Sequence, residues 1–174
     1  TTVFGIDSQK VESRRAVGFL PENPYFYKHL TGLETMLFFG RLCGLSGTGL
    51  RNQARELLKL TGLEEAADRR LAGYSKGMLQ RIGLAQALLH DPEVLVLDEP
   101  MSGLDPIGRK EVRDLILELK RRGKTVFFST HILPDVETLC DRVGVVFEGR
   151  LRDVGRIGDL LSGHVRSVEL TAMV

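Results

Sequence analysis

The fold of this chain is decided by one stretch, Val94-Leu95-Val96-Leu97-Asp98-Glu99-Pro100. Its four aliphatic residues, bounded by Pro92 and Pro100, predict a fully buried strand of a parallel sheet. Open α/β sheets bind ligands beyond the carboxyl ends of their strands, and this strand ends in the carboxylates of Asp98 and Glu99. The pair predicts a site in which one acid binds a metal ion and the other moves a proton, although an isolated pair of acids more often only opens a loop.

Composition narrows the class of protein. The 174 residues carry a net charge of only +1. Proteins that bind nucleic acids usually carry a strongly basic surface, so the net charge does not indicate a nucleic-acid partner. The two cysteines, Cys43 and Cys140, do not form a metal-type C-x-x-C pair and fit a reducing compartment. Because no apolar run approaches the ~20 residues that span a bilayer, we expect a soluble, cytoplasmic chain.

The remaining pattern alternates strands with helices. This alternation predicts an α/β fold with a mainly parallel sheet and helices on both faces. A strand end is expected at residues 2–7, and further strands at residues 15–20, 125–129, 142–147 and 151–154. Helices are expected to begin at Thr31, to span Arg51–Leu60 and about Lys76–Leu89, to run from Asp105 to Gly123, and to lie near Pro134–Leu139. The first two of these helices form an all-α insert between strands.

Three helices begin with recognisable capping residues. Thr31 and Glu34 have the spacing of a capping box, and Asp105 precedes a proline at the first helical position. Ser75 is the expected N-cap of the helix that leads into the strand at residues 94–97. Its free backbone N–H groups and the positive end of the helix dipole favour an anion, although many such caps are purely structural.

Four stretches resemble the motifs of ATP-binding-cassette (ABC) ATPases. Tyr74–Arg81 resembles the signature motif, LSGGQ-x-QR, and Val94–Glu99 resembles the Walker B motif. Ser102–Asp105 is similar to the D-loop, and Ser129–His131 to the segment that carries the switch histidine. The motifs occur in the order of the family, and the similarity extends over about residues 17–155.

The resemblance implies a P-loop NTPase-like fold and a division of the chain. A partial ABC ATPase domain over residues 1–174 would comprise core segments at about 1–27 and 89–155, a helical subdomain at about 28–88, and a tail at 156–174. No G-x-x-x-x-G-K-[ST] phosphate loop occurs in the sequence. We therefore expect a chain truncated at its N-terminus, which alone neither binds ATP tightly nor hydrolyses it.

The resemblance also implies roles for individual residues toward ATP and Mg²⁺. Asp98 would hold Mg²⁺, Glu99 would polarise the attacking water, and His131 would approach the γ-phosphate. Asp105 would make a contact across a dimer. The other residues expected at the nucleotide are Glu22, Ser75, Lys76, Gly77 and Gln80.

Departures from the family pattern indicate a branch. Glu22 stands where the family usually has glutamine, while Lys76 replaces a glycine and Met78 a glutamine of the signature. This combination is similar to the branch that serves ABC-2-type exporters of drugs or sodium. The expected function is ATP hydrolysis that energises export through a transmembrane permease, with a second ABC ATPase subunit and no nucleic acid as partners.

Two alternatives stay open at the level of sequence. One is a nucleic-acid or chromosome-maintenance ATPase of the same superfamily, and the other is a non-catalytic interaction module. The aromatic residues Tyr25, Phe26 and Tyr27 similarly allow two interpretations, as a contact for the permease or as core of the helical subdomain. As a permease-bound subunit, the protein would lie at the inner face of the cell membrane.

Overall fold

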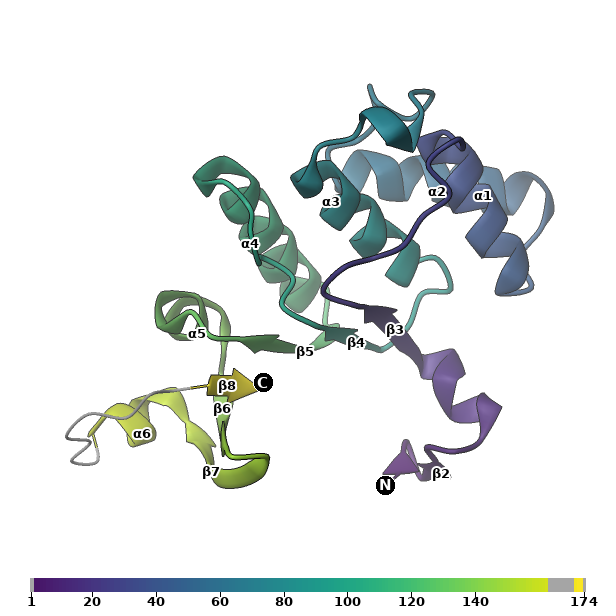
Figure 1. Ribbon diagram of the computed structural model, residues 1–174. Helices are drawn as coiled ribbons and strands as arrows, with labels where there is room; N and C mark the ends of the chain where they lie inside the picture. Colours follow the sequence, from purple (N-terminus) through teal and green to yellow (C-terminus); the bar gives the residue numbers. More distant parts are fainter. Residues whose placement is uncertain (1, 163–170, 174) are drawn as a thin grey trace.

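The computed structural model describes residues 2–162 and 171–173, and within this range a six-stranded sheet supports a group of helices (Figure 1). Of the tail predicted at residues 156–174, residues 163–170 and 174 lie outside the described residues. The strands are β1 (Thr2–Val3), β2 (Ile6–Asp7), β3 (Val17–Leu20), β4 (Val94–Leu97), β5 (Thr125–Thr130), β6 (Arg142–Phe147), β7 (Arg150–Arg156) and β8 (Thr171–Met173). The helices are η1 (Val11–Ala16), α1 (Gly32–Leu42), α2 (Gly47–Leu60), η2 (Leu71–Gly73), α3 (Lys76–Ala87), α4 (Pro106–Arg121), α5 (Leu133–Leu139) and α6 (Ile157–Ser162).

The sheet has a parallel half and an antiparallel half. Its strand order is β3-β4-β5-β8-β6-β7, and β4 pairs in parallel with β3 and with β5. The pairings of β8 with β5 and β6, and of β6 with β7, are antiparallel. The predicted α/β fold and the strand at residues 94–97 are confirmed. The two-stranded β1-β2 sheet and β8 were not expected from the sequence.

One face of the parallel strands carries the main hydrophobic core. Helices α3 and α4 both lie on this face (Figure 1). The core contains buried aliphatic residues from β3, β4, α3 and α4 together with Phe128 from β5. Its buried residues are Leu20, Leu84, Ala87, Leu88, Leu95, Leu97, Met101, Leu104, Val112, Leu115, Ile116, Leu119, Phe128 and Leu139.

The opposite face of the same strands is open within the described chain. Phe19, Val96 and Phe127 are neighbours in register across β3, β4 and β5. Phe19 is 54% exposed and Phe127 is 48% exposed, while Val96 is half-buried. The prediction of a fully buried β4 was therefore wrong: side chains alternate between the two faces of a strand, and only the face against α3 and α4 is covered.

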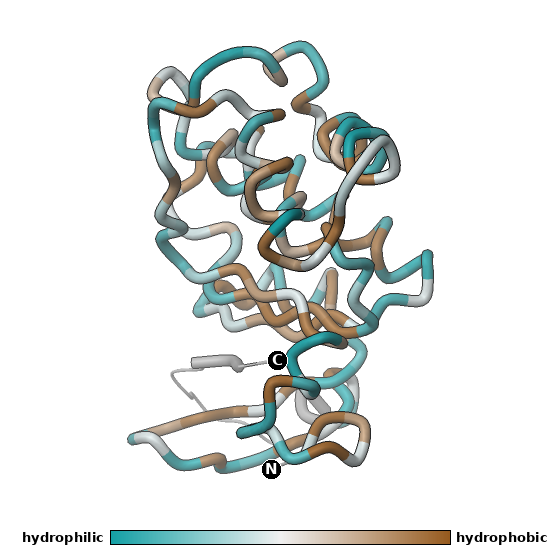
Figure 2. The backbone as a smooth tube through the Cα atoms, turned by 90° about the vertical axis from the view of Figure 1, so that its right-hand side faces the viewer, coloured by the Kyte–Doolittle hydropathy of each residue, from teal (hydrophilic) through white to brown (hydrophobic). Residues whose placement is uncertain are grey.

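The helical part between β3 and β4 has its own core. Buried residues of α1, α2 and α3 pack with Phe26 and Leu63, and Figure 2 shows hydrophobic residues recurring along these helices. The predicted capping box is present, because the hydroxyl of Thr31 accepts from the N–H of Glu34 and the carboxylate of Glu34 accepts from the N–H of Thr31. α2 begins at Gly47, one turn before the predicted start.

Candidate active site

The two carboxylates of the predicted site leave β4 at the carboxyl edge of the parallel strands. The N–H of Asp98 donates to the carbonyl of Leu20 over 2.8 Å, which continues the pairing with β3 past the end of the strand. Glu99 follows with a φ of 44°, in the left-handed region that few residues other than glycine adopt. Asp98 is exposed and Glu99 is half-buried. The site is therefore open to a ligand from outside the sheet.

Ser129 joins these two acids from the neighbouring strand β5. Its hydroxyl accepts from the backbone N–H of Glu99 over 2.9 Å and donates to Oδ1 of Asp98 over 2.7 Å. We did not predict this residue as part of the site. The pairing of Leu97 with Phe128 places Ser129 beside Asp98, so the signal lies in the strand register.

His131 contacts the second acid. Its Nδ1 lies 2.9 Å from Oε1 of Glu99, and an ionised carboxylate only accepts, so Nδ1 carries the hydrogen of this bond. The histidine side chain is 63% exposed and the glutamate side chain is 21% exposed. The structure thus brings together Asp98, Glu99 and His131 at one edge of the sheet, and His131 presents its remaining ring nitrogen for another partner.

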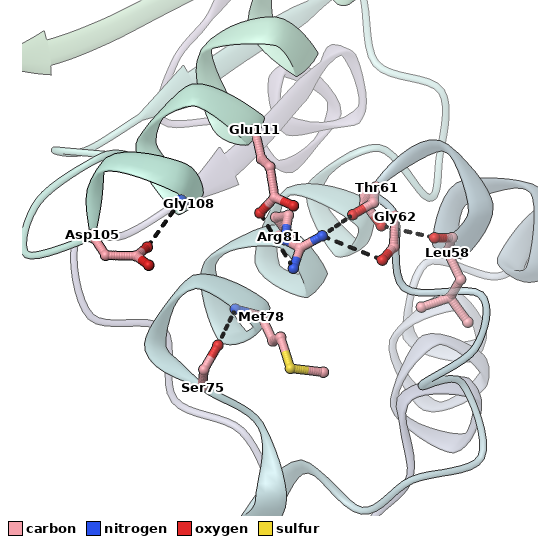
Figure 3. A network of polar contacts seen from close by, with 9 residues as sticks. All are labelled: Leu58, Thr61, Gly62, Ser75, Met78, Arg81, Asp105, Gly108 and Glu111. Carbon is pink, nitrogen blue, oxygen red and sulfur yellow. Dashed lines mark hydrogen bonds and ion pairs between the residues drawn. The ribbon is translucent and has the colours of Figure 1, made fainter.

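A second group of predicted residues gathers where α3 and α4 begin (Figure 3). The hydroxyl of Ser75 accepts from the N–H of Met78, and the carboxylate of Asp105 accepts from the N–H of Gly108 over 2.9 Å. Both predicted N-caps are confirmed. Since each cap occupies only one N–H group, the other N–H groups of the first helical turn of α3 stay available to an anion.

The start of α3 contacts the segment that precedes α4. Gly103 has a φ of 63°, and a Cβ atom there would collide with Nζ of Lys76. A Cβ on Gly77 would come within 4.0 Å of Leu104 and Gly108. The signature-like and D-loop-like segments therefore lie against each other, and Lys76 extends over the second of them.

Gln80 and Glu22 are linked, but Gln80 does not reach the surface. Its side chain is 1% exposed, and Nε2 donates to the backbone carbonyl of Glu22 over 3.5 Å. The carboxylate of Glu22 is on an exposed residue. The expected direct contact of Gln80 with a nucleotide does not fit this burial. Its placement fits a residue that holds the loop carrying Glu22.

The oxygen atoms at the carboxyl end of β4 suit a hydrated magnesium ion better than a metal ion enclosed by protein ligands. Among the residues that the structure describes, no group of three or more His, Cys, Asp or Glu side chains could hold a metal ion. Asp98 has one oxygen bonded to Ser129 and one without such a bond, on an exposed residue. Mg²⁺ at nucleotide sites keeps several waters and takes one or two carboxylates, so this residue fits that ion.

Comparison with known proteins assigns the family. Residues 3–102 match the protein family described as ABC transporter. The chain belongs to this family. The ABC transporter ATP-binding protein NatA of Bacillus subtilis is 37% identical over 172 residues, which are 97% of this chain and 70% of that protein. The bacitracin transport ATP-binding protein BcrA of Bacillus licheniformis is 45% identical over 152 residues, or 86% of this chain and 49% of that protein.

Solved structures agree with this ABC transporter assignment. One is the structure of an ATP-binding subunit of an ABC transporter, which is 30% identical with a TM-score of 0.78 over 91% of this chain and 67% of the other. A second is the ADP conformation of an ATP-binding cassette, 25% identical with a TM-score of 0.74 over 83% and 62% of the two chains. The chain spans about half the length of curated relatives that are 47% and 48% identical to it.

Arg81, the last residue of the signature-like stretch of this ABC transporter chain, connects three helices (Figure 3). From α3, its Nη1 donates to the carbonyls of Thr61 and Gly62 at the end of α2, over 3.1 and 3.2 Å. Its Nη2 lies 3.5 Å from Oε2 of Glu111 on α4. Sequence reasoning placed Arg81 in a motif but gave it no role, because its partners are remote in the sequence.

The aromatic loop after β3 divides between core and surface. Phe26 is 7% exposed and belongs to the core of the helical part, where its ring meets that of Phe39. Tyr25 is 87% exposed, and Tyr27 is 49% exposed with its ring centroid 5.5 Å from that of Phe38. The interpretation as core is confirmed for Phe26, whereas the interpretation of the exposed Tyr25 and Tyr27 as a contact for the permease stays a prediction. None of the described helices has the length and apolar character needed to cross a membrane.

Proposed function

We propose that this chain is part of an ABC transporter subunit that hydrolyses ATP and thereby energises export through a membrane permease. The observation that carries the proposal is the meeting of Asp98, Glu99 and His131 at the carboxyl edge of β4 and β5. The names of two similar proteins, a bacitracin transport protein of Bacillus licheniformis and a linearmycin resistance protein of Bacillus subtilis, support export. They give no support to a nucleic-acid ATPase or to an interaction module.

The residues at this edge fit ATP hydrolysis. Asp98 would take Mg²⁺ through its free oxygen, and the bound ion would neutralise charge on the β- and γ-phosphates. Glu99 would accept hydrogen-bond donation from the attacking water. His131, held by Glu99 through Nδ1, would donate from Nε2–H to the γ-phosphate, a contact that requires the imidazolium form because the carboxylate and the phosphate oxygen both only accept. A general base in the role proposed for Glu99 contributes about 10²–10⁴-fold in rate.

The first turn of α3 would bind a nucleotide held by a second ATPase subunit. Ser75, Lys76 and Gly77 offer a hydroxyl, an ammonium group and backbone N–H groups at one helix start. Asp105 at the start of α4 would contact that same subunit. Glu22 would meet Mg²⁺ or a water on its own side, with Gln80 holding its loop. We retain the division into a helical subdomain at about 28–88 and core segments around it as part of this proposal.

Mutation of the general base tests the hydrolytic part. In the whole protein with its permease, Glu99→Gln should lower steady ATP turnover by at least about 10²-fold, because the amide no longer accepts a proton. Glu93→Gln is the matched control, since Glu93 is exposed just before the other end of β4. Equal turnover by the Glu99→Gln variant and the unaltered protein would refute the assignment, as would loss of activity in the Glu93 variant alone.

We also propose that the permease binds beside the exposed tyrosines, which would place the subunit at the inner face of the cell membrane. Tyr25 is unusually exposed for an aromatic residue, and Tyr27 lies near it on the same loop. Replacing both tyrosines by alanine should abolish co-purification of the permease and leave the fold intact. Phe4→Ala removes a ring that is 61% exposed elsewhere on the chain and should not affect co-purification.

A further inference from the structure

We propose that Ser129 is a positioning residue that sets the geometry of Asp98 and Glu99, the two acids of the candidate active site. This inference rests on the function proposed above. Ser129 touches neither a nucleotide nor the reacting atoms in this assignment. It acts through Asp98 and Glu99, which it joins with one hydroxyl group. The chemical environment of each acid would therefore depend on a residue of the neighbouring strand.

The first step is the backbone of Glu99. Its φ of 44° lies in the left-handed region, which costs a residue with a Cβ atom conformational free energy. The turn also ends the backbone pairing that β4 makes, so the N–H of Glu99 needs another acceptor. The hydroxyl oxygen of Ser129 supplies one at 2.9 Å. This bond favours the strained turn and thereby the direction in which the Glu99 side chain leaves the backbone.

The second step is the orientation of the hydroxyl hydrogen. Because a backbone N–H can only donate, the oxygen of Ser129 is the acceptor toward Glu99. Its single hydrogen is then free to point at Oδ1 of Asp98, 2.7 Å away. One carboxylate oxygen of Asp98 is therefore engaged, and the other would be available to Mg²⁺. The arrangement has a fixed direction, from the N–H of Glu99 through Ser129 to Asp98.

The third step is the match with His131, which directly follows the strand that carries Ser129. Ser129 and His131 are two residues apart, and each contacts the carboxylate of one of the two acids that follow β4. The strand end of β5 thus holds Asp98 through a hydroxyl and Glu99 through an imidazole. Alanine or valine at position 129 cannot make either bond of Ser129, whereas threonine keeps the hydroxyl.

The structural test uses the 174-residue chain without nucleotide. Hydrogen exchange of the Glu99 amide, followed by NMR, should be about 5- to 10-fold faster in Ser129→Ala, the ratio expected for one lost hydrogen bond. Ser129→Thr should restore slow exchange. Thr130→Val is the matched control, because the Thr130 hydroxyl accepts from Ile132 and contacts neither acid. Its Glu99 amide should exchange at the original rate.

The functional test uses the whole protein with its permease. Ser129→Ala should lower kcat for ATP about tenfold or more with little change in KM, and Ser129→Thr should recover most of it. Slow exchange of the Glu99 amide in Ser129→Ala would overturn the inference, and so would a Ser129→Thr variant as impaired as Ser129→Ala. If Ser129→Ala does not fold, Ser129→Cys replaces it, since sulfur is a weak acceptor, and the same outcomes apply.

The two arms also separate this inference from the proposed function. A whole protein that does not hydrolyse ATP at all would refute the proposed function. The exchange rates of the Glu99 amide would still decide whether Ser129 holds the turn. Turnover that depends on Glu99 but not on Ser129, together with unchanged exchange in Ser129→Ala, would leave the proposed function intact and refute the inference.

Discussion

Replacing Arg81 by alanine should destabilise the joint between α2, α3 and α4. The guanidinium group donates to two carbonyls at the end of α2 and pairs with Glu111 on α4. Its side chain is only 15% exposed, so water is a poor substitute for most of these contacts. A cation beside the last carbonyls of a helix is also favourable for the helix dipole. The alanine variant loses all of these interactions together.

The expected loss follows from how buried each partner is. The carbonyl of Thr61 belongs to a residue that is 3% exposed, so its bond to a charged donor should contribute about 1.5–3 kcal/mol. Gly62 is exposed, and water replaces much of that second bond. Glu111 is 44% exposed at 3.5 Å, so its ion pair should contribute less than about 1 kcal/mol. We therefore expect a loss of about 2–4 kcal/mol in the free energy of unfolding.

Urea denaturation of the 174-residue chain measures this loss, and two variants separate its parts. Glu111→Gln removes only the ion pair and should cost less than about 1 kcal/mol, with the cost shrinking at high salt. A double-mutant cycle between Arg81 and Glu111 gives the coupling energy directly. If the free energy of unfolding of Arg81→Ala lies within about 0.5 kcal/mol of that of the original chain, Arg81 does not stabilise the contact between the three helices. A loss equal to that of Glu111→Gln would show that the bonds to Thr61 and Gly62 contribute nothing.

Three further predictions follow from single elements. Hydrogen bonds from the backbone and hydroxyl of Thr31 lower the pKa of Glu34 below its ordinary value of 4.5, so its stabilisation is present above pH 4.5 and is lost as pH falls through the lower folded pKa. Glu34→Gln should flatten this part of the stability-pH curve measured by urea unfolding. Phe128→Ala, at a 3% exposed position, should cost about 3–5 kcal/mol in urea, whereas Phe127→Ala on the open face should cost under about half of that. Asp105→Ala should lower the free energy of unfolding, measured by urea denaturation, by about 0.5–2 kcal/mol. Asp105→Asn should lower it by little, because asparagine also caps a helix.

Features that depend on neighbouring residues were predictable from the sequence. The N-caps Thr31, Ser75 and Asp105 lie where expected, since a cap and its partner are three residues apart along the chain. The strand at residues 94–97 followed from four consecutive aliphatic residues between two prolines. His131 and Glu99 lie at one edge of the sheet because they follow neighbouring parallel strands, although the contact between them was not predicted.

Features that depend on what packs against an element were not predictable in the same way. Aliphatic residues on β4 indicate that a face is fit for burial, but they do not state which element covers it. Leu95 and Leu97 meet α3 and α4, while Val96 faces the open side with Phe19. Gln80 shows the converse limit, because a polar residue in a ligand-binding motif was expected at the surface and lies 1% exposed.

Ser129 and Arg81 show why sequence motifs alone do not predict the geometry of the site. Each makes its defining contacts with residues at least 19 positions away, Ser129 across the β4-β5 register and Arg81 across the end of α2. Neither partner is visible until strand register and helix packing are known. Both residues also use one polar group to satisfy two backbone or carboxylate partners at once. A motif match therefore identified where the chemistry of this chain lies, while the residues that hold it in shape came from tertiary structure.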